Sequence, residues 1–165
     1  MIYLDNAATT PVKREVFDKM APYFCDVYAN PSSAYTFAGK AKAAIDEARE
    51  IIAQTLNAET NEICFTSGGS EADNWAIIGA ARAYAKKNAG DDKRLCGHII
   101  TSKIEHHAIL HSCRALEKLG HSITYLEPSS EGYVSLSDLQ SAITDQTKLV
   151  SIMYANNELG SIQPI

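Results

Sequence analysis

Short apolar runs alternate with amphipathic segments along most of the chain, and this alternation restricts the fold more than any other feature of the sequence. The short runs predict strands at residues 62–66, 98–102, 122–126 and 148–153. The amphipathic segments predict helices at residues 37–56, 107–119 and 137–143, with a further helix carrying Trp75, Ile78, Ala81 and Ala85 on one face. Strands separated by helices pair in parallel through right-handed crossovers. We therefore expect an α/β fold with a mainly parallel sheet in a three-layer α/β/α arrangement.

Composition and charge exclude several classes of partner. The 165 residues are 45% hydrophobic and 21% charged, as in an ordinary folded protein, and contain no internal repeat or Pro/Gly-rich linker, so one continuous unit is expected. The formal charge of −5 offers no basic surface for nucleic acid. No apolar run approaches the roughly 18 to 20 residues that span a bilayer, and the first residues do not resemble a signal peptide. We therefore expect a cytoplasmic protein with no nucleic-acid or membrane partner.

The cysteines lack the spacing of a disulfide framework or a zinc finger. They are Cys25, Cys64, Cys96 and Cys113. Cys64 lies within the apolar run 62–66 and is expected to be a buried small side chain with no chemical role.

Unusual polar residues gather in loops that follow predicted strands. These loops are residues 67–71, 103–107 and 155–160. In parallel α/β sheets, ligands bind beyond the carboxyl ends of the strands, where such loops meet. The first loop contains Gly68, Gly69 and Ser70 before a helix, and the free N–H groups of a helix start can bind an anion such as phosphate. A tight connection between strand and helix would explain the same residues.

The other two loops contain imidazole and amide side chains. Glu105, His106 and His107 form the end of the second loop, where an imidazole could stack on an aromatic ring, exchange protons or simply be exposed near a helix start. A metal site is not expected there, because adjacent residues on a helix point in different directions and no third ligand is evident. Asn156 and Asn157 in the third loop could donate to a ligand oxygen or form an ordinary turn.

Taken together, several motifs resemble the cysteine desulfurase family, in the class V branch of fold-type I enzymes that use pyridoxal 5'-phosphate (PLP). The motifs are Tyr3–Pro11, Asn30–Ser33, Phe65–Asn74, Thr101–Ala108 and Val150–Gly160. They occur in the family's order with similar spacing, and the resemblance extends essentially from Ile2 to Ile165. It implies that residues 1–165 are the N-terminal part of the PLP-binding large domain, without the rest of that domain or the C-terminal small domain.

The resemblance also assigns roles position by position. It implies that Gly69 and Ser70 donate to the cofactor phosphate, where the family more often has Ala or Gly followed by Thr. His106 is similar to the histidine that stacks on the pyridine ring and assists proton transfer, and is the expected catalytic residue. Asn157 resembles the amide that contacts the phenolic oxygen of the ring. His107 is then expected to be only a helix-start residue.

In the family reaction, L-cysteine becomes L-alanine after a protein cysteine takes up the sulfur as a persulfide, for iron–sulfur cluster or thio-cofactor assembly. The resemblance places the Schiff-base lysine, the Asp facing the pyridine nitrogen and the persulfide-forming cysteine beyond residue 165. We therefore expect residues 1–165 alone to be inactive. A homodimer and a sulfur-acceptor or scaffold protein are the implied partners. A selenocysteine lyase, an aminotransferase, or a non-catalytic or split subunit that needs a complementing chain are the alternatives.

Overall fold

The computed structural model describes residues 2–88 and 96–164. Contacts within the chain divide it into two compact units, Met1–Phe65 and Thr66–Ile165, and each is described by itself. None of the helices in the described ranges combines the length and apolar character that crossing a bilayer requires. The assignment of residues 1–165 to part of a larger PLP-binding domain stays a prediction.

The first unit is helical. Its elements are α1 (Arg14–Met20), α2 (Pro22–Cys25), α3 (Thr36–Leu56) and the short 3-10 helix η1 (Thr60–Glu62). The long helix α3 confirms the helix predicted at residues 37–56, and its buried residues are small: Ala38, Ala41 and Ala53. It ends at Asn57, which adopts the left-handed conformation with a φ of 52°. The backbone N–H of Asn57 donates to the carbonyls of Ala53 and Gln54. Such a residue is a common way to end a helix.

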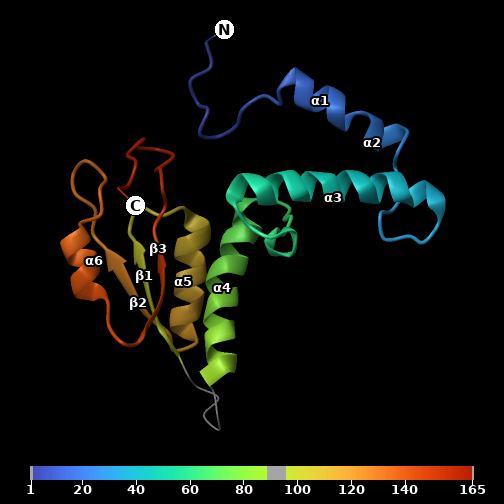
Figure 1. The fold of residues 1–165 in the computed structure, drawn as a ribbon. Coiled ribbons are helices and arrows are strands. Elements are labelled where there is room, and N and C mark those ends of the chain that lie inside the picture. Colours follow the sequence, from blue (N-terminus) through green and yellow to red (C-terminus); the bar gives the residue numbers. More distant parts are fainter. Residues whose placement is uncertain (1, 89–95, 165) are drawn as a thin grey trace. The chain divides into compact units, whose positions relative to one another are not determined.

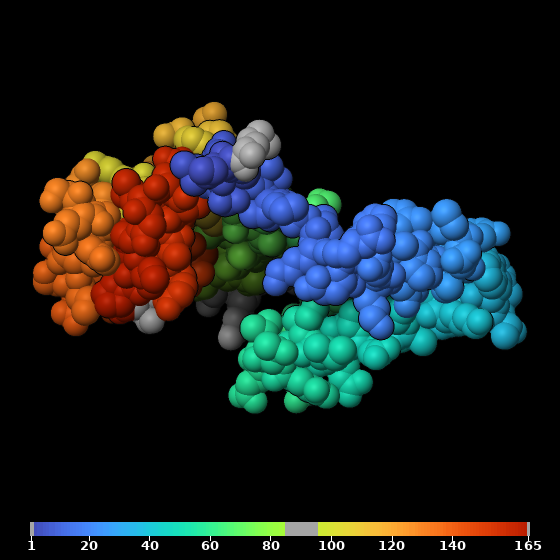
Figure 2. Space-filling model, turned by 90° about the horizontal axis from the view of Figure 1, so that it is seen from above, coloured from blue at the N-terminus to red at the C-terminus, as the bar shows by residue number. Residues whose placement is uncertain are grey.

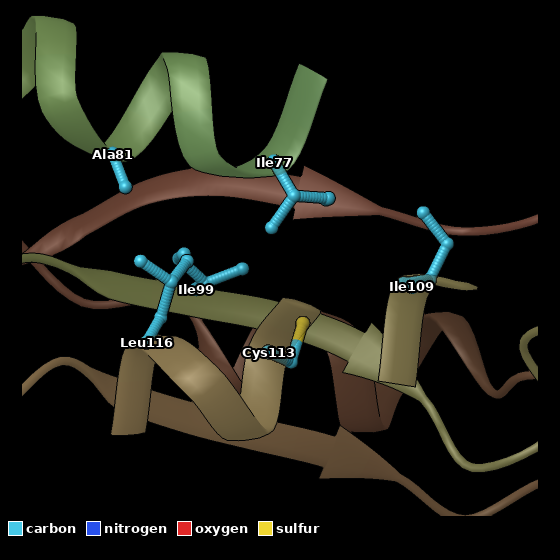
Figure 3. Close-up of a cluster of buried hydrophobic side chains, with 6 residues drawn as sticks. All are labelled: Ile77, Ala81, Ile99, Ile109, Cys113 and Leu116. Carbon is cyan, nitrogen blue, oxygen red and sulfur yellow. The ribbon is translucent and has the colours of Figure 1, made fainter. Parts of the chain in front are cut away.

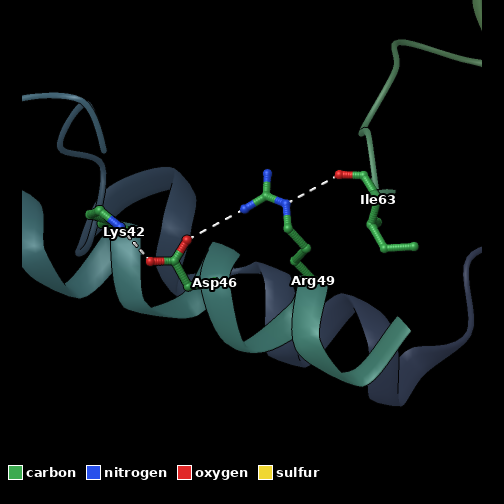
Figure 4. A network of polar contacts seen from close by, with 4 residues as sticks. All are labelled: Lys42, Asp46, Arg49 and Ile63. Atoms are coloured by element: carbon green, nitrogen blue, oxygen red, sulfur yellow. Dashed lines mark hydrogen bonds and ion pairs between the residues drawn. The ribbon is translucent and has the colours of Figure 1, made fainter. Parts of the chain in front are cut away.

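Arg49 of α3 contacts the segment that follows η1. Its Nε donates to the carbonyl of Ile63 at 3.3 Å, and its Nη1 lies 3.4 Å from Asp46, which also pairs with Lys42 (Figure 4). The guanidinium also lies 5.1 Å from the centroid of the Phe65 ring. These contacts hold the extended residues 63–65 through side chains rather than through a strand neighbour.

The strand predicted at residues 62–66 is wrong. Glu62 ends η1, and in the described part of the chain the residues that follow pair with no strand. A strand is defined by hydrogen bonds to a neighbour, and an apolar run cannot supply that neighbour by itself. Cys64 is accordingly exposed, so its expected burial is also wrong.

The second unit contains a parallel sheet. In its described residues the strands are β1 (His98–Ser102), β2 (Ser122–Leu126) and β3 (Thr147–Ser151), in the order β2-β1-β3. All neighbours pair in parallel, and the central strand β1 is buried along its whole length. A strand covered on both faces reads as a continuous apolar run, which is why His98–Ser102 was recognisable.

Helices cover both faces of this sheet (Figure 1). They are α4 (Gly69–Asn88), α5 (His107–Lys118) and α6 (Leu136–Ala142). Successive residues of β1 point to opposite faces. Ile99 packs with residues of α4 and α5, whereas Ile100 packs with Leu126 and Val134 in a second cluster that Leu139 of α6 joins. The predicted three-layer α/β/α fold is therefore confirmed.

The larger core lies between the sheet and helices α4 and α5 (Figure 3). Its buried members are Ile77, Ala81, Ile99, Ile109, Cys113 and Leu116. The α5 members recur every three or four residues, so one stripe of that helix faces the sheet. Burial raises the pKa of the Cys113 thiol to about 11, with the nearby carboxylates of Glu117 and Glu105 adding to the effect. Trp75, on the predicted face of α4, remains 56% exposed.

A buried histidine at the start of β1 contacts both neighbouring strands. The Nδ1 of His98 lies 2.8 Å from the hydroxyl of Thr147 on β3, and its Nε2 lies 2.8 Å from the hydroxyl of Thr124 on β2. The pairing of β1 with β3 is irregular between His98 and Ile99. The side chain therefore connects all three strands, and its contact with Thr147 lies where the pairing of β1 with β3 is irregular.

Candidate functional site

The carboxyl ends of the three parallel strands lie at one edge of the sheet, together with the starts of α4 and α5 (Figure 1). Figure 2 is viewed onto this edge, where the residues after β3 (red) lie beside the segment that contains α6 (orange). A pocket of about 320 Å³ opens here. Its lining comes from two loops and the first turn of α5: Lys103, Ile104, Glu105, His106, His107, Leu110, Asn156, Asn157, Glu158 and Leu159. The structure thus brings His106 and Asn157 to one pocket.

His106 is the N-cap of α5 and is exposed. Its Nδ1 accepts a hydrogen bond from the backbone N–H of Ala108 at 3.1 Å. An imidazole nitrogen that accepts carries no proton, so in the neutral ring the proton is on Nε2. The cap therefore fixes both the orientation and the tautomer of the ring, and leaves its face and Nε2 available to a ligand.

Glu105 is buried and ties the loop of His106 to the end of β3. Its Oε1 accepts from the hydroxyl of Ser102 at 2.9 Å and from the backbone N–H of Met153 at 2.7 Å. Burial raises the pKa of the carboxyl, although these two hydrogen bonds oppose the effect, and the nearby carboxylate of Asp73 adds to it. Glu105 therefore connects the last residue of β1, Ser102, with Met153 in the segment after β3.

The two adjacent asparagines have different environments. Asn156 is buried, and its Nδ2 donates to the carbonyl of Ile104 at 3.0 Å. Its Oδ1 accepts from the backbone N–H groups of Glu158 at 2.9 Å and Leu159 at 2.8 Å. Asn157 is exposed on the pocket wall. Asn156 thus fixes the two loops to each other and leaves the amide of Asn157 available to a ligand.

Gly69 and Ser70 begin α4 at the same edge but are not part of the lining of this pocket. A Cβ added at Gly68 or Gly69 would meet nothing within 4 Å in the described structure, so packing within the chain does not require either glycine. Glu71 accepts from both the N–H and the hydroxyl of Ser67, which lowers the pKa of its carboxyl. The turn is therefore ordered but open on its outer side.

A polar link connects the starts of α4 and α5. Asn74 donates from Nδ2 to the carbonyl of Ser70 at 2.6 Å, and its Oδ1 accepts from the hydroxyl of Ser112 at 2.8 Å. The hydroxyl oxygen of Ser112 also lies 2.7 Å from the carbonyl oxygen of Ala108, so its single proton is shared between two acceptors. The Gly-Gly-Ser turn and the first turn of α5 are thus held within one hydrogen-bonded network.

Other charged side chains of the loops have a structural explanation. Lys103 pairs with Glu127 at the end of β2, and both side chains are exposed. Within the described residues, no group of three or more His, Cys, Asp or Glu side chains is arranged to hold a metal ion.

These features define a class: an α/β protein with a candidate ligand site at the carboxyl edge of a parallel sheet. The family model described as aminotransferase class-V matches residues 2–165, and the chain belongs to this family. A Clostridium botulinum protein named cysteine desulfurase IscS is 56% identical over 164 residues, which cover 99% of this chain and 39% of the relative. A Methanosarcina thermophila protein of the same name is 52% identical with the same coverage. The chain therefore spans about two fifths of the length of these curated relatives.

Solved structures agree with the sequence relatives. A structure of SspA in complex with cysteine is 45% identical, with a TM-score of 0.88, over 98% of this chain and 44% of that protein. A NifS-like protein is 37% identical, with a TM-score of 0.89, over 99% of this chain and 43% of that protein. The chain therefore has the fold of a part of these longer proteins.

The contributions of Glu105 and Asn156 were not recognised in the sequence. An Asn side chain that accepts from the N–H groups two and three residues later forms a known local turn, and the sequence Asn156 to Gly160 is compatible with it. That signal could have separated Asn156 from Asn157. The partners of Glu105 are Ser102 at the end of β1 and Met153 in the segment after β3, and no local pattern indicates the contact with Met153.

Proposed function

We propose that this chain is the N-terminal, PLP-binding part of a cysteine desulfurase. The observation that carries the proposal is the pocket that places the exposed ring of His106 opposite an ordered loop bearing the exposed amide of Asn157. The relatives named cysteine desulfurase and the SspA structure with cysteine support it. L-cysteine is then the substrate, and a protein cysteine receives its sulfur.

The residues at the carboxyl edge fit PLP. Gly69 and Ser70 would hold its phosphate at the start of α4, where unpaired N–H groups favour an anion and no side chain fills the space over Gly69. His106 would stack on the pyridine ring, and Asn157 would donate to the phenolic oxygen. When bound, PLP supplies an electron sink for bond cleavage at an amino acid.

The chain's own contribution is to position these groups and to handle protons. His106 can give or take a proton only at Nε2, because Nδ1 is engaged by the N–H of Ala108. Glu105 and Asn156 hold the two loops at a fixed separation through Met153 and Ile104. We assign His106 as the catalytic residue, and Glu105 and Asn156 as positioning residues.

The residues 1–165 on their own are proposed to lack desulfurase activity. On the family resemblance, the lysine that anchors PLP and the cysteine that receives sulfur belong to the part of the relatives that this chain does not span. Within residues 1–165, Cys113 is buried with a raised pKa, which suits packing and not sulfur transfer. A cytoplasmic homodimer that passes sulfur to an acceptor or scaffold protein, for iron–sulfur cluster or thio-cofactor assembly, completes the proposal.

The test is alanine release from L-cysteine, in the presence of PLP and a reductant, by the longest native protein that contains this chain. We expect activity there and none from pure residues 1–165. His106→Ala should lower kcat by about 10²-fold or more, the usual contribution of a general acid–base. Ser70→Ala should weaken PLP binding by about tenfold, equivalent to one lost charge-assisted hydrogen bond. Release of alanine only from L-selenocysteine, or formation of a keto acid, would replace the proposal by one of the related activities.

A further inference from the structure

Two histidines on α5 form a stacked, exposed pair. His107 and His111 are four residues apart, and their ring centroids lie 5.7 Å from each other with an interplanar angle of 23°. Both side chains are exposed. Residues at this spacing lie on the same face of a helix, so both imidazoles extend from one side of α5.

These two rings differ from the other histidines of the chain. Both nitrogens of His98 contact threonine hydroxyls, and His106 and His121 each use Nδ1 to accept a backbone N–H, the latter from Gly97 at 3.3 Å. In the described structure, no hydrogen bond or ion pair involves a ring nitrogen of His107 or His111. Both exposed rings therefore have nitrogens that no described hydrogen bond occupies.

We propose that His107 and His111 together bind one divalent transition-metal ion. Two imidazoles four residues apart on a helix are the spacing by which helical histidines hold zinc. Imidazole suits copper, nickel and zinc, whereas calcium and magnesium prefer oxygen ligands. Affinity should be highest for Cu²⁺ and lower for Ni²⁺ and Zn²⁺, as the general order of divalent metals requires. Water completes the coordination, since the described residues contain no group of three metal-binding side chains.

The site is distinct from the adjacent histidine pair. The ring centroids of His106 and His107 are 6.2 Å apart and their planes are tilted by 55°, and the cap already uses one nitrogen of His106. His107 also belongs to the wall of the candidate pocket, whereas His111 does not. A bound ion would thus lie at the rim of the pocket, held by two residues to which the proposed function gives no contact with PLP.

The test uses the untagged 165-residue chain, titrated with Cu²⁺ by calorimetry and examined by electron paramagnetic resonance. The variants are His107→Gln and His111→Gln, which keep a polar helix-compatible side chain on an exposed face. The matched control is His121→Gln, outside α5. Circular dichroism confirms that each variant retains its helix content before titration. The proposal does not depend on PLP or on desulfurase activity.

We expect one Cu²⁺ per chain, with nitrogen hyperfine splitting from two imidazoles. Each single variant on α5 should bind Cu²⁺ at least about tenfold more weakly, equivalent to 1.4 kcal/mol. The control should match the unmodified chain. Absence of binding by the unmodified chain, or unchanged affinity in either α5 variant, would overturn the proposal. Equal losses in His121→Gln and the α5 variants would do the same, because the ion would then not be held by this pair.

Discussion

Replacing Asn156 by alanine should destabilise the second unit, whereas the same change at its neighbour Asn157 should not. The Asn156 side chain makes one hydrogen bond to the carbonyl of Ile104 and accepts two from the N–H groups of Glu158 and Leu159. A hydrogen bond contributes about 0.5–1.5 kcal/mol net. Because Glu158 and Leu159 are exposed, water can replace part of the loss. We therefore expect Asn156→Ala to lower the free energy of unfolding by about 2 kcal/mol.

The assay is urea denaturation followed by the fluorescence of Trp75, the single tryptophan, which lies on α4 in the second unit. With a slope of about 1–2 kcal/mol per molar urea, the midpoint of Asn156→Ala should fall by about 1–2 M. Asn157→Ala is the matched control and should stay within about 0.5 kcal/mol, as exposed substitutions usually do. Equal midpoints for the two variants would refute the division of roles between these asparagines.

Two further predictions concern buried titratable groups. The native pKa of Glu105 is raised above its ordinary value of 4.5, so between these two values the native state binds more protons than the unfolded state and stability falls as pH rises. Glu105→Gln should remove this pH-dependent loss of stability. The test is the free energy of unfolding, measured by urea denaturation across this pH range, for the unmodified chain and for Glu105→Gln. The same pH dependence in both proteins would contradict the prediction. Cys113, with its pKa of about 11, should react with a thiol reagent at pH 8 only after unfolding, whereas exposed Cys64 should react at once. Mass mapping of the modified cysteines distinguishes the two, and prompt labelling of Cys113 in the folded chain would show that its burial is wrong.

The elements of the core could be predicted because their information is local. Helix α3 was placed within one residue of its start, and β1 matched its predicted bounds, since the apolar periodicity of each segment reflects the face it buries. The segment 62–66 has the same kind of apolar run, yet it forms no ladder in the described structure. Strand formation depends on a neighbour elsewhere in the chain, which a single run does not encode.

The position of the candidate site could be predicted from the sequence, but the roles of its individual residues could not. The loops were found because polar residues follow apolar strands, and parallel pairing then brings their ends together. The roles within each loop depend on partners far along the chain, such as the bond from Met153 to Glu105 across 48 residues. Asn156 and Asn157 carry the same side chain, and in the structure their burial and hydrogen bonds distinguish them.

His98, which contacts both strands that neighbour β1, couples the hydroxyl groups of two threonines. Each ring nitrogen of His98 is in contact with one threonine hydroxyl, so in the neutral ring one nitrogen donates while the other accepts. Moving the ring proton from one nitrogen to the other would therefore require the hydroxyls of Thr124 and Thr147 to reverse their directions together. The two hydroxyls are 23 residues apart in the sequence and belong to strands that are not neighbours in the sheet. The orientation of one hydroxyl therefore determines the orientation of the other through the imidazole ring.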